Sequence, residues 1–540
     1  MMSFKSLLGV TLLMVASACA PDVVVQSDQD NYPPNTEQVS KTDRQPKPAP
    51  KPYGIVDWRH YNNNPDFKPV TLPNGTVANI SAFQVAAPAS RAVMPRDAIK
   101  VSDNVWVLSG WFYAPVVIET PNGLIVGPSG EHQGEGKIFR DIIREKISTK
   151  PIIAVLIDHA HYSKGTEALL DGDDAMIIAH PDHDEIMRTS GELSNPNIEE
   201  LLPGMDAKAR IHFSTMHPKE GADAPLGGSS GSLELNQARG WKPTTRVMQD
   251  GDTVTIDGVE IQAFHAITDT RDSLTFWFPQ TKMVVDNVMW GMLPNLYTLR
   301  GDKYRSPQDW MDGIAQIRDL EPEILIGLGG GAKPIYGKDD IKKATNALYD
   351  AIAFVYDQSL RLTNAGVSPD QIRHYVEFPK SLTGHPFVNE VYGEVSTFYE
   401  AFPTYNSGWF SGKAEDIHSL PDTIKAEKQI GLAGGRDKVF AAYEDAIDTG
   451  ELLWAKDLAV MLYNSGPADA KARQALADVF RQMGQRTPSI IVRNFYTAGA
   501  LSLEGNEGFT SSHVQSAEWV KSDLGRAVRQ LRTRLDPATA

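Results

Sequence analysis

Hydrophobic and polar positions alternate with two different periods between residues 100 and 335. The run PIIAVLID, 151–158, is typical of a buried strand, whereas GEGKIFRDIIREKIS, 134–148, carries apolar residues at helical spacing. PNG at 121–123 and the dipeptide Asp257-Gly258 separate apolar runs in the way that hairpin turns do. The pattern predicts an α/β region of two mixed sheets layered between helices.

The pattern becomes helical after Lys338. The segment 339–366 has a long helical periodicity, and shorter helical hairpins follow it. We therefore predict an α/β domain at 53–338, an all-helical domain at 339–505 and a helical tail at 506–540. The formal net charge of −16 argues against nucleic acid as a partner, because phosphates would be repelled.

The first residues have the pattern of a secretory signal. Lys5 is followed by an apolar run and by small residues before Cys19, the single cysteine of the chain. This predicts a lipoprotein signal peptide at 1–18, a proline-rich linker at 19–52, and a lipid anchor on Cys19. The protein is then expected in the periplasm, tethered to the membrane, with the outer membrane favoured. A plain signal peptide with an incidental cysteine is the alternative.

Two histidines stand at the end of the buried run, in LIDHAHYSKG. At the end of a strand, residues two apart point to the same side, so His159 and His161 can hold one metal ion. Zinc would need at least a third protein ligand. The other interpretation is a pair of surface histidines without a metal.

Four further motifs occur in one order along the chain: DSLTFWFP at 272–279, NLYTLRG at 295–301, DQSLRLTNAG at 357–366 and RNFYTAGA at 493–500. Together they resemble the bacterial alkyl sulfatases (linear and secondary alkylsulfatases) of the metallo-β-lactamase fold. The resemblance implies an αββα sandwich with zinc, followed by a helical dimerisation domain and hence a homodimer. The sterol-carrier-like C-terminal domain of many members is not expected here.

The resemblance also implies a ligand set for one zinc ion. His159 and His161 match the family's histidine pair, and Asp269 stands where its first acidic ligand is expected. Asp286 is the best match for the bridging acid, with Asn287 as the alternative. Both positions carry aspartate where the family has glutamate, so the metal would sit closer to the backbone.

The ligands of the family's second zinc are replaced. Ser163 and Lys164 stand in place of an aspartate and a histidine, and the third position falls in GGAKP, 330–334. An ammonium group repels a cation at this distance. We therefore expect a single zinc ion, with Lys164 supplying the positive charge of the lost one beside Asp286 or the substrate. A Lys164 side chain turned into solvent is the alternative.

Arg300 matches the family arginine that contacts the sulfate, and its guanidinium suits an oxyanion. A structural arginine at a domain junction is the other interpretation. The predicted function is a metal-dependent hydrolase of alkyl sulfates or similar anionic amphiphilic esters. In it, Asp286 orients water, and Arg300 and Lys164 hold the anionic group. The alternative is a non-catalytic periplasmic dimer that binds anions or lipids.

Overall fold

This computed structural model describes residues 69–72, 74–79, 96–111, 113–189, 204–225, 240–266, 268–294, 296, 299–300, 305–328, 334–506, 520–521 and 524–531. Cys19, the predicted signal and linker, and the stretch 330–333 lie outside these ranges. No helix among the described residues is long and apolar enough to cross a membrane.

Seven strands form the first sheet, in the order β3-β4-β5-β6-β7-β8-β9. Pairing is antiparallel up to β6 and parallel from β6 to β9. The turn at 121–123 joins β5 to β6, so the predicted hairpin is confirmed. The strands are Asp97–Ser102 (β3), Val105–Ser109 (β4), Val116–Glu119 (β5), Leu124–Gly127 (β6), Ile152–Leu156 (β7), Met176–Ala179 (β8) and Arg246–Val247 (β9).

Six strands form the second sheet, in the order β10-β11-β12-β13-β14-β15. The predicted hairpin at Asp257-Gly258 is confirmed: both residues have positive φ angles, 46° and 88°, as a tight turn between twisted strands requires. The strands are Thr253–Ile256 (β10), Val259–His265 (β11), Leu274–Phe278 (β12), Met283–Met289 (β13), Ile324–Leu328 (β14) and Ile335–Tyr336 (β15).

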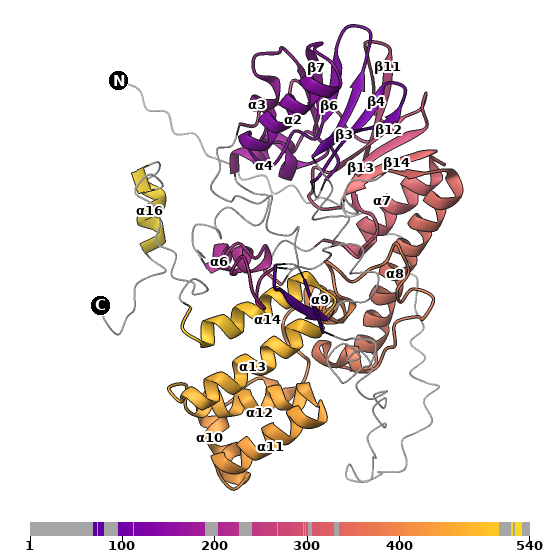
Figure 1. Cartoon of the computed structure of the whole chain (residues 1–540). Coiled ribbons are helices and arrows are strands. Elements are labelled where there is room, and N and C mark those ends of the chain that lie inside the picture. The colour runs from indigo at the N-terminus through magenta and orange to yellow at the C-terminus, as the bar shows by residue number, and fades with distance from the viewer. Residues whose placement is uncertain are drawn as a thin grey trace, which may run out of the picture. The chain divides into compact units, whose positions relative to one another are not determined.

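Three hydrophobic cores define four layers. One core joins the inner faces of the two sheets, where Val107 and Ile125 meet Phe276 and Val285. A second lies between the first sheet and helices α2 (Gln133–Lys146) and α3 (Thr166–Leu170). A third lies between the second sheet and helices α7 (Pro307–Asp319) and α8 (Lys338–Asn364). The two sheets therefore lie between helical layers (Figure 1), and the predicted αββα sandwich is confirmed.

The rest of the described chain is mostly helical, as predicted. After α8 come a 3₁₀ helix, η4 (Pro369–His374), and α9 (Val395–Ser407). Helices α10 to α13 share a separate hydrophobic core, visible as the orange helices of Figure 1. The remaining elements are α4 (His183–Thr189), α6 (Gly204–His212), α10 (Asp422–Leu432), α11 (Arg436–Thr449), α12 (Leu452–Ser465), α13 (Ala470–Arg486), α14 (Ile490–Leu503), α16 (Leu524–Leu531), β1 (Pro69–Thr71), β2 (Val77–Asn79), η3 (Ala160–Tyr162) and η5 (Ala414–Asp416).

Candidate metal centre

The histidine pair lies directly after β7, at the carboxyl end of a parallel strand, where α/β sheets commonly carry their sites. The sequence predicted that an extended strand end would bring both rings to one side. Instead, His159 is extended, with φ −169° and ψ 175°, and the chain then turns through the 3₁₀ helix η3. The turn brings the ring centroids of His159 and His161 to 5.0 Å from each other.

Asp269 joins the pair from the turn between β11 and β12. Its Oδ2 lies 2.7 Å from Nδ1 of His161 and 3.6 Å from Nε2 of His159. One potential ligand atom from each residue falls in a group whose members all lie within 4.8 Å of one another. Two loops more than a hundred residues apart thus bring together the three side chains that the sequence singled out.

Asp158 and Arg305 contact the outer sides of these ligands. Oδ1 of Asp158 lies 3.2 Å from Nδ1 of His159, on the ring edge away from Asp269. Nε of Arg305 lies 2.8 Å from Oδ1 of Asp269, which leaves Oδ2 facing the histidines. Outer carboxylates and cations of this kind fix the orientation of metal-binding side chains. Sequence reasoning missed both residues, although Asp158 adjoins the histidine pair and Arg305 lies five positions after Arg300.

The charges around the group favour a cation. Burial alone would lower the pKa of His159, but the carboxylates of Asp158 and Asp269 raise it to about 10. Burial would raise the pKa of Asp269, yet Arg305 and the two histidines hold it well below its usual range. The carboxylates of Asp158 and Asp269 thus supply negative charge next to His159, as a bound cation requires.

The three residues fit a divalent transition metal ion. Nε2 of His159 and Nε2 of His161 are buried and have no hydrogen-bond partner. Burying a polar atom without a partner costs free energy, and a metal ion bound to these nitrogens would remove that cost. Two imidazoles with one carboxylate form a donor set known from catalytic zinc sites, in which one coordination position stays open. The convergence of these donors is the feature that indicates a metal centre.

Asp286 does not belong to the converging group. It lies on β13, and its Oδ1 accepts hydrogen bonds from the backbone N–H of Val288 at 2.7 Å and from the indole of Trp290 at 3.2 Å. Burial, together with the charge of Asp158, raises its pKa well above the ordinary value, although both hydrogen bonds oppose the shift. Its predicted roles as bridging ligand and as the residue that orients the water stay predictions.

Ser163 and Lys164 are tied into the backbone around them. The Ser163 hydroxyl donates to the carbonyl of Ala160 at 3.0 Å. Lys164 is buried. Its backbone N–H donates to the carbonyl of Gly130 at 2.9 Å, and its carbonyl accepts a hydrogen bond from the N–H of Gly240 at 2.7 Å. A Cβ on the following Gly165 would lie 2.3 Å from the carbonyl oxygen of Ser129, so the segment is tightly packed. The predicted pairing of the Lys164 ammonium with Asp286 or the substrate stays a prediction.

Arg300 lies in a different electrostatic environment. It is buried, at 4% exposure, and its guanidinium carbon stands 5.4 Å from the ring centroid of Phe213, just after α6. Burial and the charges of Arg300 and Arg305 lower the pKa of the neighbouring His212 well below its ordinary value. The two buried guanidinium groups of Arg300 and Arg305 therefore both influence His212. Arg305 also pairs with Asp269 of the metal group.

His183 is another buried histidine, and its partner comes from the turn that carries Asp269. Nδ1 of His183, at the start of α4, is 2.9 Å from Oδ2 of Asp272, and both residues are almost completely buried. Asp272 belongs to the same turn as Asp269. His180, after β8, and His265, at the end of β11, stack on each other at 4.2 Å and are not members of the metal group.

An αββα sandwich in which two histidines after the parallel strand β7 meet an aspartate from the β11–β12 turn is the architecture of a metal-dependent hydrolase. Comparison with known proteins identifies its family. Residues 368–506 match the family model for alkyl sulfatase dimerisation. A linear primary-alkylsulfatase of Pseudomonas sp. (strain ATCC 19151) is 30% identical over 401 residues, covering 72% of this chain and 74% of that relative. The chain belongs to the alkylsulfatase family.

Two further comparisons agree with this assignment. An (R)-specific secondary-alkylsulfatase of Pseudomonas sp. is 25% identical over 427 residues, covering 76% of this chain and 62% of that relative. The solved structure of the stereoselective inverting sec-alkylsulfatase Pisa1 from Pseudomonas sp. matches with a TM-score of 0.69 at 21% identity, over 87% of this chain and 78% of that one. The structural match supports the fold from the sandwich into the helical region.

Proposed function

We propose that this protein hydrolyses the sulfate ester of an alkyl sulfate, or of a similar anionic amphiphile, at a single zinc site. The observation that carries the proposal is the buried convergence of His159, His161 and Asp269 in a chain of the alkylsulfatase family. These three residues would hold the ion. When bound, zinc supplies Lewis acidity to the reaction.

Three further residues are proposed to bind the substrate and to assist the reaction. Arg300 binds and orients the sulfate group, because a buried guanidinium offers several donors in a fixed plane. Asp286 orients the water or accepts a proton from it at its carboxylate. Lys164 adds positive charge for the ester oxygens that become negative as the bond breaks. Lys164→Met is expected to weaken binding of decyl sulfate more than binding of zinc.

The single-metal part of the proposal is supported by the replaced second site. Among the described residues, one group of histidine and acidic side chains has the geometry to hold an ion. The Ser163 hydroxyl donates to the backbone carbonyl of Ala160. We expect the ammonium of the neighbouring Lys164 to supply the positive charge of the missing ion.

The direct test is to purify the chain without added metal, measure its metal content, and follow sulfate release from decyl sulfate. We expect bound metal, or rescue of activity by zinc or manganese after treatment with a chelator. A chain that binds no metal and releases no sulfate after either addition would contradict the hydrolase. Decyl sulfate binding without turnover would instead support the non-catalytic binder.

The assembly and location of the protein belong to the same proposal. The match to the alkyl sulfatase dimerisation model supports a homodimer, which light scattering at micromolar concentration would detect. Cys19 and the segment before it support export and lipid attachment. Labelling of cells with a fatty-acid probe should modify the wild-type protein and not Cys19→Ser; equal labelling of both would exclude the anchor.

A further inference from the structure

Helix α16 (Leu524–Leu531) presents apolar side chains to solvent. Leu524, Val528 and Leu531 are 68%, 60% and 56% exposed. Their spacing of four and then three positions places them along one side of the helix. A single exposed leucine is common on a protein surface, whereas three such residues in a row on one helix form an apolar surface that a partner can cover.

The sequence around this helix is basic, although the chain as a whole is acidic. The segment 521–534 has a single acidic residue, Asp523, whereas the formal net charge of the chain is −16. Salt screens charges over about 8–10 Å, so the field next to the helix is set by the local basic residues. These are Lys521, Arg526, Arg529, Arg532 and Arg534.

An apolar helical face within a basic segment is the pattern of helices that lie on anionic membranes. A phospholipid surface accepts both parts at once, because the apolar face enters the acyl region while the basic residues meet the phosphates. The helix has eight residues and is therefore about 12 Å long, against about 30 Å for the hydrocarbon core of a bilayer. It can lie in the interface but cannot span it.

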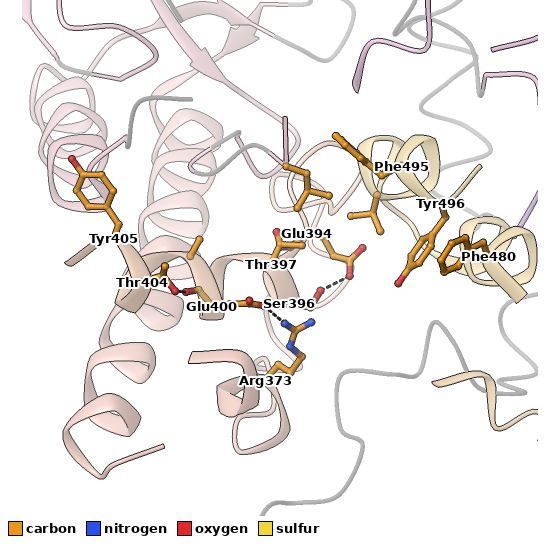
Figure 2. A pocket seen from close by; sticks show the side chains of 13 residues that line it. Arg373, Glu394, Ser396, Thr397, Glu400, Thr404, Tyr405, Phe480, Phe495 and Tyr496 are labelled. Atoms are coloured by element: carbon orange, nitrogen blue, oxygen red, sulfur yellow. Dashed lines mark hydrogen bonds and ion pairs between the residues drawn. The ribbon is translucent and has the colours of Figure 1, made fainter. Parts of the chain in front are cut away.

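An apolar cavity of the protein itself is a poorer match for this helix. A cavity of about 720 Å³ is lined by residues of α9, α13 and α14. The carboxylates of its wall are already engaged, as Figure 2 shows: Glu400 pairs with Arg373, and Glu394 accepts a hydrogen bond from Ser396. A second hydroxyl, that of Thr487, also donates to Glu394. A basic segment would gain little there, whereas an anionic membrane presents many unpaired phosphates.

We propose that α16 is a membrane-surface helix that docks on anionic phospholipid. Leu524, Val528 and Leu531 lie toward the acyl chains, and the basic charge of the segment pairs with the lipid phosphates. This contact is separate from the metal centre and from the predicted lipid on Cys19. It adds a second, reversible and salt-sensitive attachment at the other end of the chain.

The test places a fluorescent nitrobenzoxadiazole label on the apolar face of the full chain. Cys19→Ser removes the single natural thiol, and Val528→Cys supplies the labelling position. Emission should shift to the blue on vesicles of phosphatidylcholine with phosphatidylglycerol, and much less on phosphatidylcholine alone. Added salt should reverse the shift, because it screens the attraction between the helix and the lipid.

Two sets of variants separate the charge from the apolar face. Arg526→Gln with Arg529→Gln should weaken vesicle binding roughly tenfold to thirtyfold, the loss expected for two basic residues near an anionic surface. Leu524→Asp should abolish the blue shift. This position is exposed, so the substitution leaves the fold intact, which circular dichroism verifies.

The matched control carries the same label at Leu432→Cys, an exposed leucine at the end of α10. Its emission should be the same with and without vesicles. No shift at position 528 on the anionic vesicles, or an equal shift on phosphatidylcholine alone, would overturn the proposal. A shift already present without lipid would also overturn it. That result would assign the helix to a protein surface, which belongs to a second copy of the chain if the shift grows with protein concentration.

Discussion

Buried histidines occur in two opposite electrostatic environments in this protein. His159 faces the carboxylates of Asp158 and Asp269, which raise its pKa to about 10 despite burial. His212 and His217, by contrast, are buried beside guanidinium groups. Burial and the charge of Arg493 lower the pKa of His217 to about 4, although its hydrogen bond to the carbonyl of Asn494 opposes this shift. Carboxylates raise the histidine pKa in the first environment, which suits a cation, whereas guanidinium groups lower the histidine pKa values in the second and are suited to an anion.

The contrast shows how one site serves an ester with a charged headgroup. Imidazole and carboxylate are good zinc ligands, and guanidinium binds sulfate well, so a site for both keeps the two sets of charges close without neutralising each other. Arg305 connects them, because it pairs with Asp269 and also acts on His212. The following predictions change one environment at a time.

Removing a ligand from the cation environment should have the largest effect. His161→Ala deletes one of three donors, and we expect metal affinity to fall by more than about a hundredfold and sulfate release by about a thousandfold or more. Metal analysis and initial rates with decyl sulfate measure both. His265→Ala, in the stacked pair outside the metal group, is the control. Full metal content in His161→Ala would remove this residue from the ligand set.

Acid should destabilise the anion environment. The folded-state pKa of His217, about 4, is below its ordinary value of 6.5, so the unfolded chain takes up the proton first as the pH falls. Stability is therefore complete above about pH 6.5 and lost between that pH and about 4, by up to about 3 kcal/mol for this group. Urea unfolding at several pH values should show the wild type losing that much more stability than His217→Gln. Equal losses would contradict the pKa shift.

Neutralising Arg300 should weaken substrate binding while leaving the metal in place. A charge-assisted hydrogen bond contributes about 1.5–3 kcal/mol, so Arg300→Met should raise the KM for decyl sulfate by roughly 10- to 100-fold. Arg318→Met, which changes an arginine on α7 paired with Asp319, is the matched control. A parallel loss of metal content would place Arg300 in the cation environment instead.

Arg305→Met should have the smallest effect of these substitutions, because Arg305 acts through Asp269. Loss of an orienting partner typically reduces metal affinity about tenfold, and we expect that value from competition with a colorimetric chelator. Anion binding should also decline, since the second guanidinium disappears. Unchanged affinity for both metal and decyl sulfate would contradict the idea that Arg305 links the metal ligands to the anion-binding residues.

Much of this fold could be predicted from periodicity, since both hairpins, the buried strands and the long helix α8 depend on local patterns. The three converging metal residues were also recognisable, two by their spacing and Asp269 by family motifs. The contacts of Arg305 with Asp269 were not, because 36 residues separate them and only tertiary packing brings them together.

The central claim, a hydrolase that works with one metal ion, is tested most directly by a metal titration. The chelator-treated protein is titrated with zinc while sulfate release from decyl sulfate is followed, and bound metal per chain is measured at each point. We predict a linear rise of activity that reaches its plateau at one zinc ion per chain. A plateau reached only at two ions per chain, or full activity without any metal, would contradict the account.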